Sequence, residues 1–212
     1  MPRFRSTKRL VFLALIASTA CAAPASALAD DLTAGNVPDL TAGACARALL
    51  GQPFAPWGDS SDYALIDNGG LENADTGWSL SGGAQVVAGN EPFYANDPSD
   101  GFSLSLPRGS SAVTPPICIS QQSPLFRFFD SSDGSDGAGL KVEVLFANAN
   151  GKVRSPTVAR IDGTGVWGPS DPLPVVADQQ LGPAETTEVA VRFTARGGAW
   201  AVDDVFVDPW HH

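Results

Sequence analysis

The sequence predicts an all-β fold, an antiparallel jelly-roll sandwich of two sheets. Short runs of aliphatic, aromatic and β-branched residues recur every ~8–12 residues, separated by Gly, Pro, Asn and Asp, as is typical of such sandwiches. Almost no segment has a helical period, and strands do not alternate with helices as a parallel sheet requires. The two halves of the chain do not repeat each other, so we expect neither a solenoid nor a propeller.

The first residues have the pattern of a secretory signal peptide. Basic residues precede an uncharged apolar run over residues 10–20, and Ala27-Leu28-Ala29 fits a cleavage site. We therefore expect residues 1–29 to be removed and the mature chain to be secreted, extracellular or associated with the cell envelope. The apolar run is shorter than the ~20 residues of a spanning helix, and no later segment is long and apolar enough, so we expect no membrane span. Cys21 leaves a lipoprotein as the alternative, although the usual lipid-attachment motif has Leu where Ser18 stands.

The mature segment is strongly acidic. Four of the 13 basic residues and none of the 23 acidic residues precede Asp30, which leaves a net charge of −14 after cleavage. Such a surface repels nucleic acid and anionic lipid, so we expect no nucleic-acid partner. It is compatible with binding of a cation or of neutral sugars.

Residues 30–56 are expected to form a flexible lead. Residues 30–42 are polar and rich in Gly and Ala without a period, and a short helical segment is expected at residues 44–50, ended by Gly51 and Pro53. The jelly-roll domain is then expected to span residues 57–212.

Strands follow at regular spacing. In chain order they are expected at residues 63–66, 78–80, 85–88, 103–106, 112–114, 117–119, 126–129, 140–146, 153–161, 187–195 and 200–207. Asn68-Gly69-Gly70 and Asn150-Gly151 are turn signals between them. Strict alternation predicts core-facing sets along two of the later strands. These sets are Leu140, Val142, Val144 and Phe146, then Val189, Val191 and Phe193.

The acidic segment 130–137 invites comparison with a calcium loop. Its acidic residues come at every third position rather than every second, and Lys141 stands where an EF-hand has its closing Glu. We therefore expect a solvated hairpin loop.

Two cysteines remain after cleavage, Cys45 and Cys118. An isolated pair in an oxidising compartment usually forms one disulfide. Two thiols without a nearby His are too few for a metal site.

The residues for most catalytic chemistry are missing. The only histidines are His211 and His212, so a nucleophile has no well-placed base and zinc has no His ligand set. No nucleotide-binding or G-x-S-x-G motif occurs. A glycosidase needs only two carboxylates and stays open, with Glu91 and Glu143 as candidates, although no E-x-D-x-x-E cluster is present.

Two end motifs carry a resemblance to a known family. Asn68-Gly69-Gly70-Leu71-Glu72-Asn73 leads into Gly77-Trp78, and the last strand contains Val202-Asp203-Asp204-Val205. Together they resemble carbohydrate-binding modules with a galactose-binding-like jelly roll. The segments 89–93 and 103–107 are also similar to uncharacterised exported proteins of actinobacteria.

The resemblance implies a non-catalytic domain with its first and last strands close together. It also implies a structural Ca²⁺ bound by Glu72 and by Asp203 or Asp204, with backbone carbonyls. Ca²⁺ prefers six to eight oxygen ligands in irregular geometry. Asp203 and Asp204 should point to opposite faces of their strand, so at most one should face the core. The alternative is that Asp204 caps backbone amides near the Gly69-Gly70 turn.

Aromatic side chains are the candidate ligand-binding groups, because sugars stack their apolar faces on such rings. Trp78 and Trp200 lie in alternating strands and are expected in the core. Trp167, Phe93 and Tyr94 lie in loop-like stretches and are expected on the surface. Three functions stay open: a carbohydrate-binding protein that takes a polysaccharide or other glycan, a structural or protein-interaction domain of the cell envelope, and a small glycoside-cleaving enzyme.

Overall fold

The structure is a computed structural model that describes residues 49–120, 125–148, 150–177 and 186–208. By its contacts the chain divides into residues 1–31 and residues 32–212, and every described residue belongs to the second unit. The expected signal peptide, Cys21, Cys45 and the two histidines lie outside the described residues.

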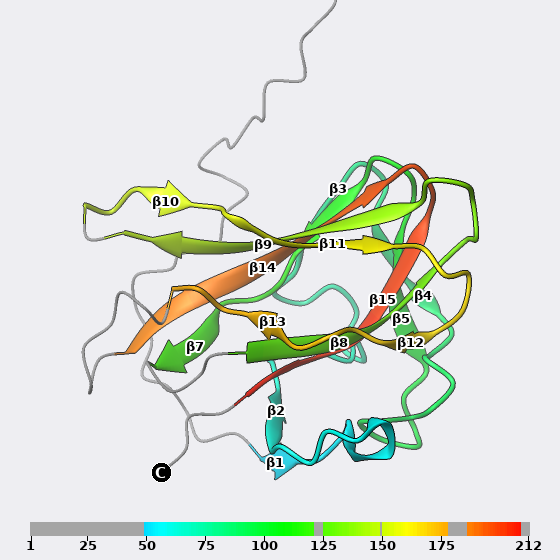
Figure 1. The fold of residues 1–212 in the computed structure, drawn as a ribbon, viewed down its shortest axis with the longest axis horizontal. Helices are drawn as coiled ribbons and strands as arrows, with labels where there is room; N and C mark the ends of the chain where they lie inside the picture. Colours follow the sequence, from blue (N-terminus) through cyan, green and yellow to red (C-terminus); the bar gives the residue numbers. More distant parts are fainter. Residues whose placement is uncertain (1–48, 121–124, 149, 178–185, 209–212) are drawn as a thin grey trace, which may run out of the picture. The chain divides into compact units, whose positions relative to one another are not determined.

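Within these ranges the chain forms two antiparallel sheets, seen as two layers in Figure 1. The first sheet contains β1 (Leu50–Gly51), β2 (Tyr63–Leu65), β4 (Gln85–Ala88), β5 (Phe102–Leu106), β8 (Leu125–Ser132), β12 (Gly168–Pro169), β13 (Leu173–Pro174) and β15 (Trp200–Val207). The second contains β3 (Ser79–Ser81), β6 (Ser111–Val113), β7 (Ile117–Ser120), β9 (Gly139–Ala147), β10 (Val153–Arg154), β11 (Thr157–Asp162) and β14 (Thr186–Arg196). The predicted all-β jelly-roll sandwich is confirmed.

The main core lies between the sheets and is built by alternation. The predicted inward sets of β9 and β14 are all buried in it, and so are Trp78 and Trp200, which are 7% and 3% exposed. Apolar residues spaced two apart along a strand reach the same face, so burial of each face stabilises the pairing register.

A second apolar cluster covers the opposite face of the first sheet. Phe129 and Phe206 each follow a core residue on their strand and therefore point away from the core. With Tyr63 they surround Phe54, whose side chain is fully buried. The 3₁₀ turn η1 (Ala55–Trp57) follows Phe54 and lies over this face.

This cluster corrects the predicted start of the domain. Residues 50–56 were expected in a flexible lead, but Leu50 and Gly51 pair with β2, and Phe54 is buried. The expected helical segment at residues 44–50 lies mostly outside the described residues, and its last residue is in a strand. The pairing partner of β1 is distant in sequence, so no local pattern signals it.

Strand β15 runs through the centre of the first sheet. One of its edges pairs with β8; the other pairs first with β5 and then, beyond Val202, with β2. The register shifts between Asp203 and Phe206, and Asp204 has a left-handed φ of 46°. This irregularity coincides with the change of partner strand, as a β-bulge does. No helix among the described residues is long and apolar enough to cross a membrane.

Candidate functional site

The loop of residues 89–101, between β4 and β5, is tied to the domain by buried carboxylates. Glu91 is fully buried, and its two carboxylate oxygens accept hydrogen bonds from the backbone amides of Phe93 and Ala95, the latter at 2.5 Å. The residue between those amides, Tyr94, has a left-handed φ of 52°. Because charge-assisted bonds are the strong ones, Glu91 stabilises a backbone turn that a tyrosine rarely adopts.

Asp203 and Asp204 extend the same anchoring from β15. Asp203 Oδ2 accepts the amide of Glu91 at 3.1 Å, and Asp204 Oδ2 accepts the amide of Asn96 at 3.2 Å. Both aspartates are fully buried. The two side chains were expected to point to opposite faces of the strand, but both reach the same loop, because the bulge at Asp204 interrupts the alternation.

Burial and mutual repulsion disfavour the charged forms of these aspartates. Burial, followed by the neighbouring charge of Asp204, raises the pKa of Asp203 to about 9. Burial, followed by the charges of Glu91 and Asp100, raises the pKa of Asp204 to about 7. The anchoring of the loop therefore depends on protons, or on a cation, to offset the mutual repulsion.

The carboxylate oxygens beside Gly70 match part of the expected Ca²⁺ site. Asp204 Oδ1 is buried without a hydrogen-bond partner among the described residues. A Cβ built on Gly70 would lie 2.9 Å from this oxygen and 3.6 Å from Asp100 Oδ2, so glycine leaves room for both carboxylates. These donors are oxygens, as a hard cation requires.

The fit is only partial. Glu72 Oε1 instead accepts the amides of Gly101 and Phe102, at 2.7 and 3.0 Å. The carboxylate of Asp203 accepts hydrogen bonds from the backbone amides of Glu91 and Asp204. Across the described ranges, no group of three His, Cys, Asp or Glu side chains is arranged to hold a metal. Of the three expected ligands, the geometry brings only Asp204 to the oxygen-lined space beside Gly70.

Three exposed aromatic residues lie over the anchored loop and η1. We call Trp57, Phe93 and Tyr94 the aromatic patch; they are 38%, 43% and 50% exposed. Trp57 and Phe93 meet edge to face with centroids 4.9 Å apart, and both contact the buried ring of Phe129. The rings of Trp57 and Phe93 are therefore supported by a buried ring and partly exposed, and Tyr94 follows Phe93 in the loop. Phe93 and Tyr94 were predicted on the surface; Trp57 has no sequence signal that separates it from a core tryptophan.

An arginine fixes the segment that carries Trp57. Arg127 stacks over Phe54 at 4.1 Å, donates to Ser170 O through two nitrogens and forms an ion pair with Asp59 at 2.7 Å. Burial raises the pKa of Asp59, but hydrogen bonds from Ser61, Tyr63 and Arg127 outweigh it and lower that pKa to about 2. The η1 segment is thus held on both sides of Trp57.

Trp167, the third expected ligand-binding residue, is half-buried. It packs against the cluster formed by Phe54, Tyr63, Phe129 and Phe206, just before β12. It borders the same face of the first sheet as the aromatic patch but presents less free ring surface.

Two further sequence predictions concern carboxylates. Asp130 was expected in a solvated loop, but it lies on β8, and burial raises its pKa to about 7. Glu143, a candidate for glycoside cleavage, lies on β9 and forms ion pairs with Lys141 and Arg192 at 2.7 and 2.9 Å. Glu91, the other candidate, accepts two loop amides. Both side chains are buried, at 0% and 4% exposure, so neither carboxylate is open to a glycan.

Cys118 lies on β7 and takes part in a disulfide. Its predicted partner, Cys45, lies outside the described residues, so the Cys45–Cys118 pairing stays a prediction.

Comparison with solved structures gives the same fold. The CBM22-1–GH10 modules of Clostridium thermocellum xylanase 10B, complexed with xylohexaose, match at 14% identity over 69% of this chain and 29% of that chain, with a TM-score of 0.50. A CBM61 module in complex with β-1,4-galactotriose matches at 17% identity over 68% of this chain and 96% of that chain, with a TM-score of 0.41. The CBM22-1 xylan-binding domain of Paenibacillus barcinonensis Xyn10C matches at 17% identity over 64% and 87%, with a TM-score of 0.45.

No protein-family model matches the sequence, and no curated protein matches it significantly. At such low identity the likeness is one of fold. The chain has the jelly-roll sandwich of carbohydrate-binding modules, as its two end motifs predict.

Proposed function

We propose that this chain is an exported, non-catalytic carbohydrate-binding protein that binds a neutral glycan through the aromatic patch. The observation that carries the proposal is the exposure of Trp57, Phe93 and Tyr94 on a loop and a turn that are both firmly anchored. Exposed rings on anchored backbone lose little conformational entropy on binding, which favours affinity. A pyranose has an apolar C–H face that suits such rings.

The negative net charge of the chain favours neutral over anionic glycans. Its formal net charge is −10 at pH 7, so anionic polysaccharides are repelled. The neighbours of the same fold that were crystallised with xylohexaose and β-1,4-galactotriose make these neutral oligosaccharides sensible first probes.

Calcium is proposed as a stabilising ligand, with Asp204 and Asp100 as its carboxylates and backbone carbonyls completing the site. The unpartnered buried oxygen of Asp204 supports this. When bound, the ion would offset the repulsion among the carboxylates that anchor the loop.

Thermal melts in Ca²⁺ and in chelator test the calcium proposal. At a Ca²⁺ concentration of 100 times the dissociation constant, the free energy of unfolding should rise by roughly 2.7 kcal/mol. The same melt of Asp204→Asn should not respond, and an unchanged wild-type melt removes the calcium proposal.

The glycan proposal is tested by calorimetry and by retention on insoluble xylan and galactan. Trp57→Ala and Tyr94→Ala should each weaken binding by roughly 2 kcal/mol, or about 30-fold, as truncation of an aromatic hot spot does. Phe102→Ala is the matched control, since Phe102 is 42% exposed but shares a strand face with core residue Leu104 rather than with the patch.

Thermal melts of all three variants show whether each is folded. Retention by folded Trp57→Ala at the wild-type level would overturn the proposed site. No retention of any glycan by the wild type, with a protein partner recovered instead, would favour the cell-envelope interaction domain.

A further inference from the structure

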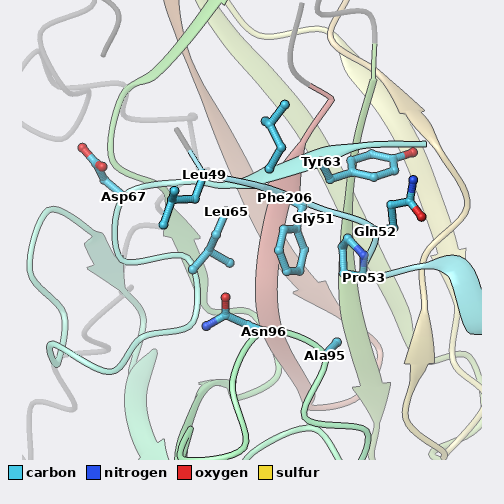
Figure 2. A pocket seen from close by; sticks show the side chains of 11 residues that line it. Leu49, Gly51, Gln52, Pro53, Tyr63, Leu65, Asp67, Ala95, Asn96 and Phe206 are labelled. Atoms are coloured by element: carbon cyan, nitrogen blue, oxygen red, sulfur yellow. The ribbon is translucent and has the colours of Figure 1, made fainter. Parts of the chain in front are cut away.

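A pocket lies beside the aromatic patch, on the same face of the first sheet. Its volume is about 590 Å³, within the ~300–1,000 Å³ typical of small-molecule sites. Figure 2 shows Asp67 and Gln52 at opposite sides of the lining residues, with Leu65 and Phe206 between them and Asn96 below these two in the view. Pro53 and Tyr63 complete the wall near Gln52.

The lining suits a molecule that is apolar on one side and rich in hydroxyl groups. Leu50, Leu65 and Pro53 supply apolar surface, whereas Asp67 and Asn96 supply hydrogen-bonding groups. No lining residue is basic, so an anionic ligand finds no partner there. A purely apolar ligand would form no hydrogen bond with Asp67 or Asn96.

The pocket and the aromatic patch are built from the same two segments. Pro53 lines the pocket, and Trp57 follows it four positions later in the patch. Ala95 lines the pocket directly after Tyr94 of the patch.

One buried ring separates the two features. Phe54 stacks on Phe129, below the patch, at 5.3 Å, and contacts Phe206, in the pocket wall, at 5.5 Å. The patch and the pocket are therefore neighbours on this face of the sheet.

Two of the polar side chains of the pocket, Asn96 and Gln52, form hydrogen bonds within the domain. Asn96 donates from Nδ2 to Asp100 at 2.8 Å, while its own amide is held by Asp204. Gln52 donates to Asp62 at 3.2 Å. A preorganised polar group loses less entropy when a ligand hydroxyl binds it.

We propose that this pocket is a second sugar subsite, in which a neutral pyranose unit of the glycan held by the aromatic patch packs on Leu50 and Leu65 and donates hydroxyl hydrogen bonds to Asp67 at its rim. The inference rests on the proposed function, which it extends from single-unit stacking to recognition of a chain long enough to reach both features.

The test is the dependence of affinity on chain length, measured by calorimetry with xylose oligomers of two to six units and the corresponding β-1,4-galactose oligomers. For the wild type, affinity should rise by about tenfold, or about 1.4 kcal/mol, once the oligomer spans both features. Asp67→Ala should lose most of this gain while binding the shortest ligands normally, since Asp67 is exposed and its removal should leave the fold unchanged.

A second variant narrows the pocket instead of removing a polar group. Gly51→Phe adds a ring to the pocket wall, at a position where a new Cβ meets no atom within 4 Å. It should abolish the length-dependent gain in the same way. Asp162→Ala, at the exposed end of β11 on the other sheet, is the control and should behave as wild type.

Wild-type length dependence in both pocket variants would overturn the subsite. If binding is then still lost in Trp57→Ala, the proposed function stands without it. Absence of binding of every oligomer to the wild type would overturn both.

Discussion

Replacement of Glu91 by Gln tests how the aromatic loop is held. The carboxylate accepts two backbone amides, and a hydrogen bond to a charged group contributes roughly 1.5–3 kcal/mol. Gln keeps one acceptor oxygen but turns an NH₂ donor toward the other amide. Part of the loss is offset, because Glu91 also raises the pKa of Asp203 and Asp204 by repulsion. The net effect should be a loss of about 2 kcal/mol in the free energy of unfolding.

Urea denaturation measures this loss, and a thermal melt should fall by ~4–8 °C for a domain of this size. Glycan affinity should fall in the folded variant as well, because Phe93 and Tyr94 lose their fixed orientation. Amide hydrogen exchange of Phe93 and Ala95 should accelerate, because their amides lose the carboxylate that accepts them. Glu188→Gln, at a half-exposed position on β14, is the matched control. Unchanged stability together with unchanged exchange at Phe93 and Ala95 would refute the anchoring role.

Three other predictions follow from the same structure. In chelator, the stability contributed by the protons on Asp203 and Asp204 should be complete below their unfolded pKa near 4, because the folded state holds these protons more tightly. This stability should be lost as the pH rises through the folded pKa values of about 7 for Asp204 and about 9 for Asp203. The melting temperature should therefore fall steadily from pH 5 to pH 9, and a flat profile would contradict the raised pKa values. Arg127→Lys keeps the charge but loses the planar guanidinium that contacts Ser170, Asp59 and Phe54. The free energy of unfolding should fall by about 2 kcal/mol, and glycan retention should weaken because Trp57 is less firmly positioned. A variant as stable as the wild type would contradict the role of Arg127 in fixing η1. The exported protein should show no free thiol from Cys45 or Cys118 by mass spectrometry under native conditions. Cys118→Ala should lower the free energy of unfolding, measured in urea, by roughly 3–5 kcal/mol. A titratable thiol in the folded wild type would contradict the pairing.

Alternation along the chain was enough to predict most strands and the main core. β9 and β15 begin and end within one residue of the predicted limits. β9 carries a continuous apolar set with period two, whereas the core-facing residues of β15 change from Trp200 and Val202 to Val205 and Val207 across the bulge at Asp204. The predicted strand over residues 153–161 is instead two, β10 and β11, with a register shift after Thr157. Such a shift depends on the partner strand rather than on local pattern.

The candidate site was predicted less completely, because its key contacts join distant segments. The sequence singles out Glu91 only as a candidate for glycoside cleavage, yet in the structure its amide donates to Asp203 from the far end of the chain. Trp57 was assigned no ligand-binding role because its support comes from Phe129 and Phe93. The period-two rule failed at Asp204 because the strand bulges where β5 gives way to β2.

The most direct test of the central claim is a chemical-shift titration of the isotopically labelled protein with the tightest-binding neutral oligosaccharide. Binding through the aromatic patch should shift the signals of Trp57, Phe93 and Tyr94 first and most strongly, with the opposite sheet unaffected. Shifts centred on β9 and β14, with the patch silent, would contradict it.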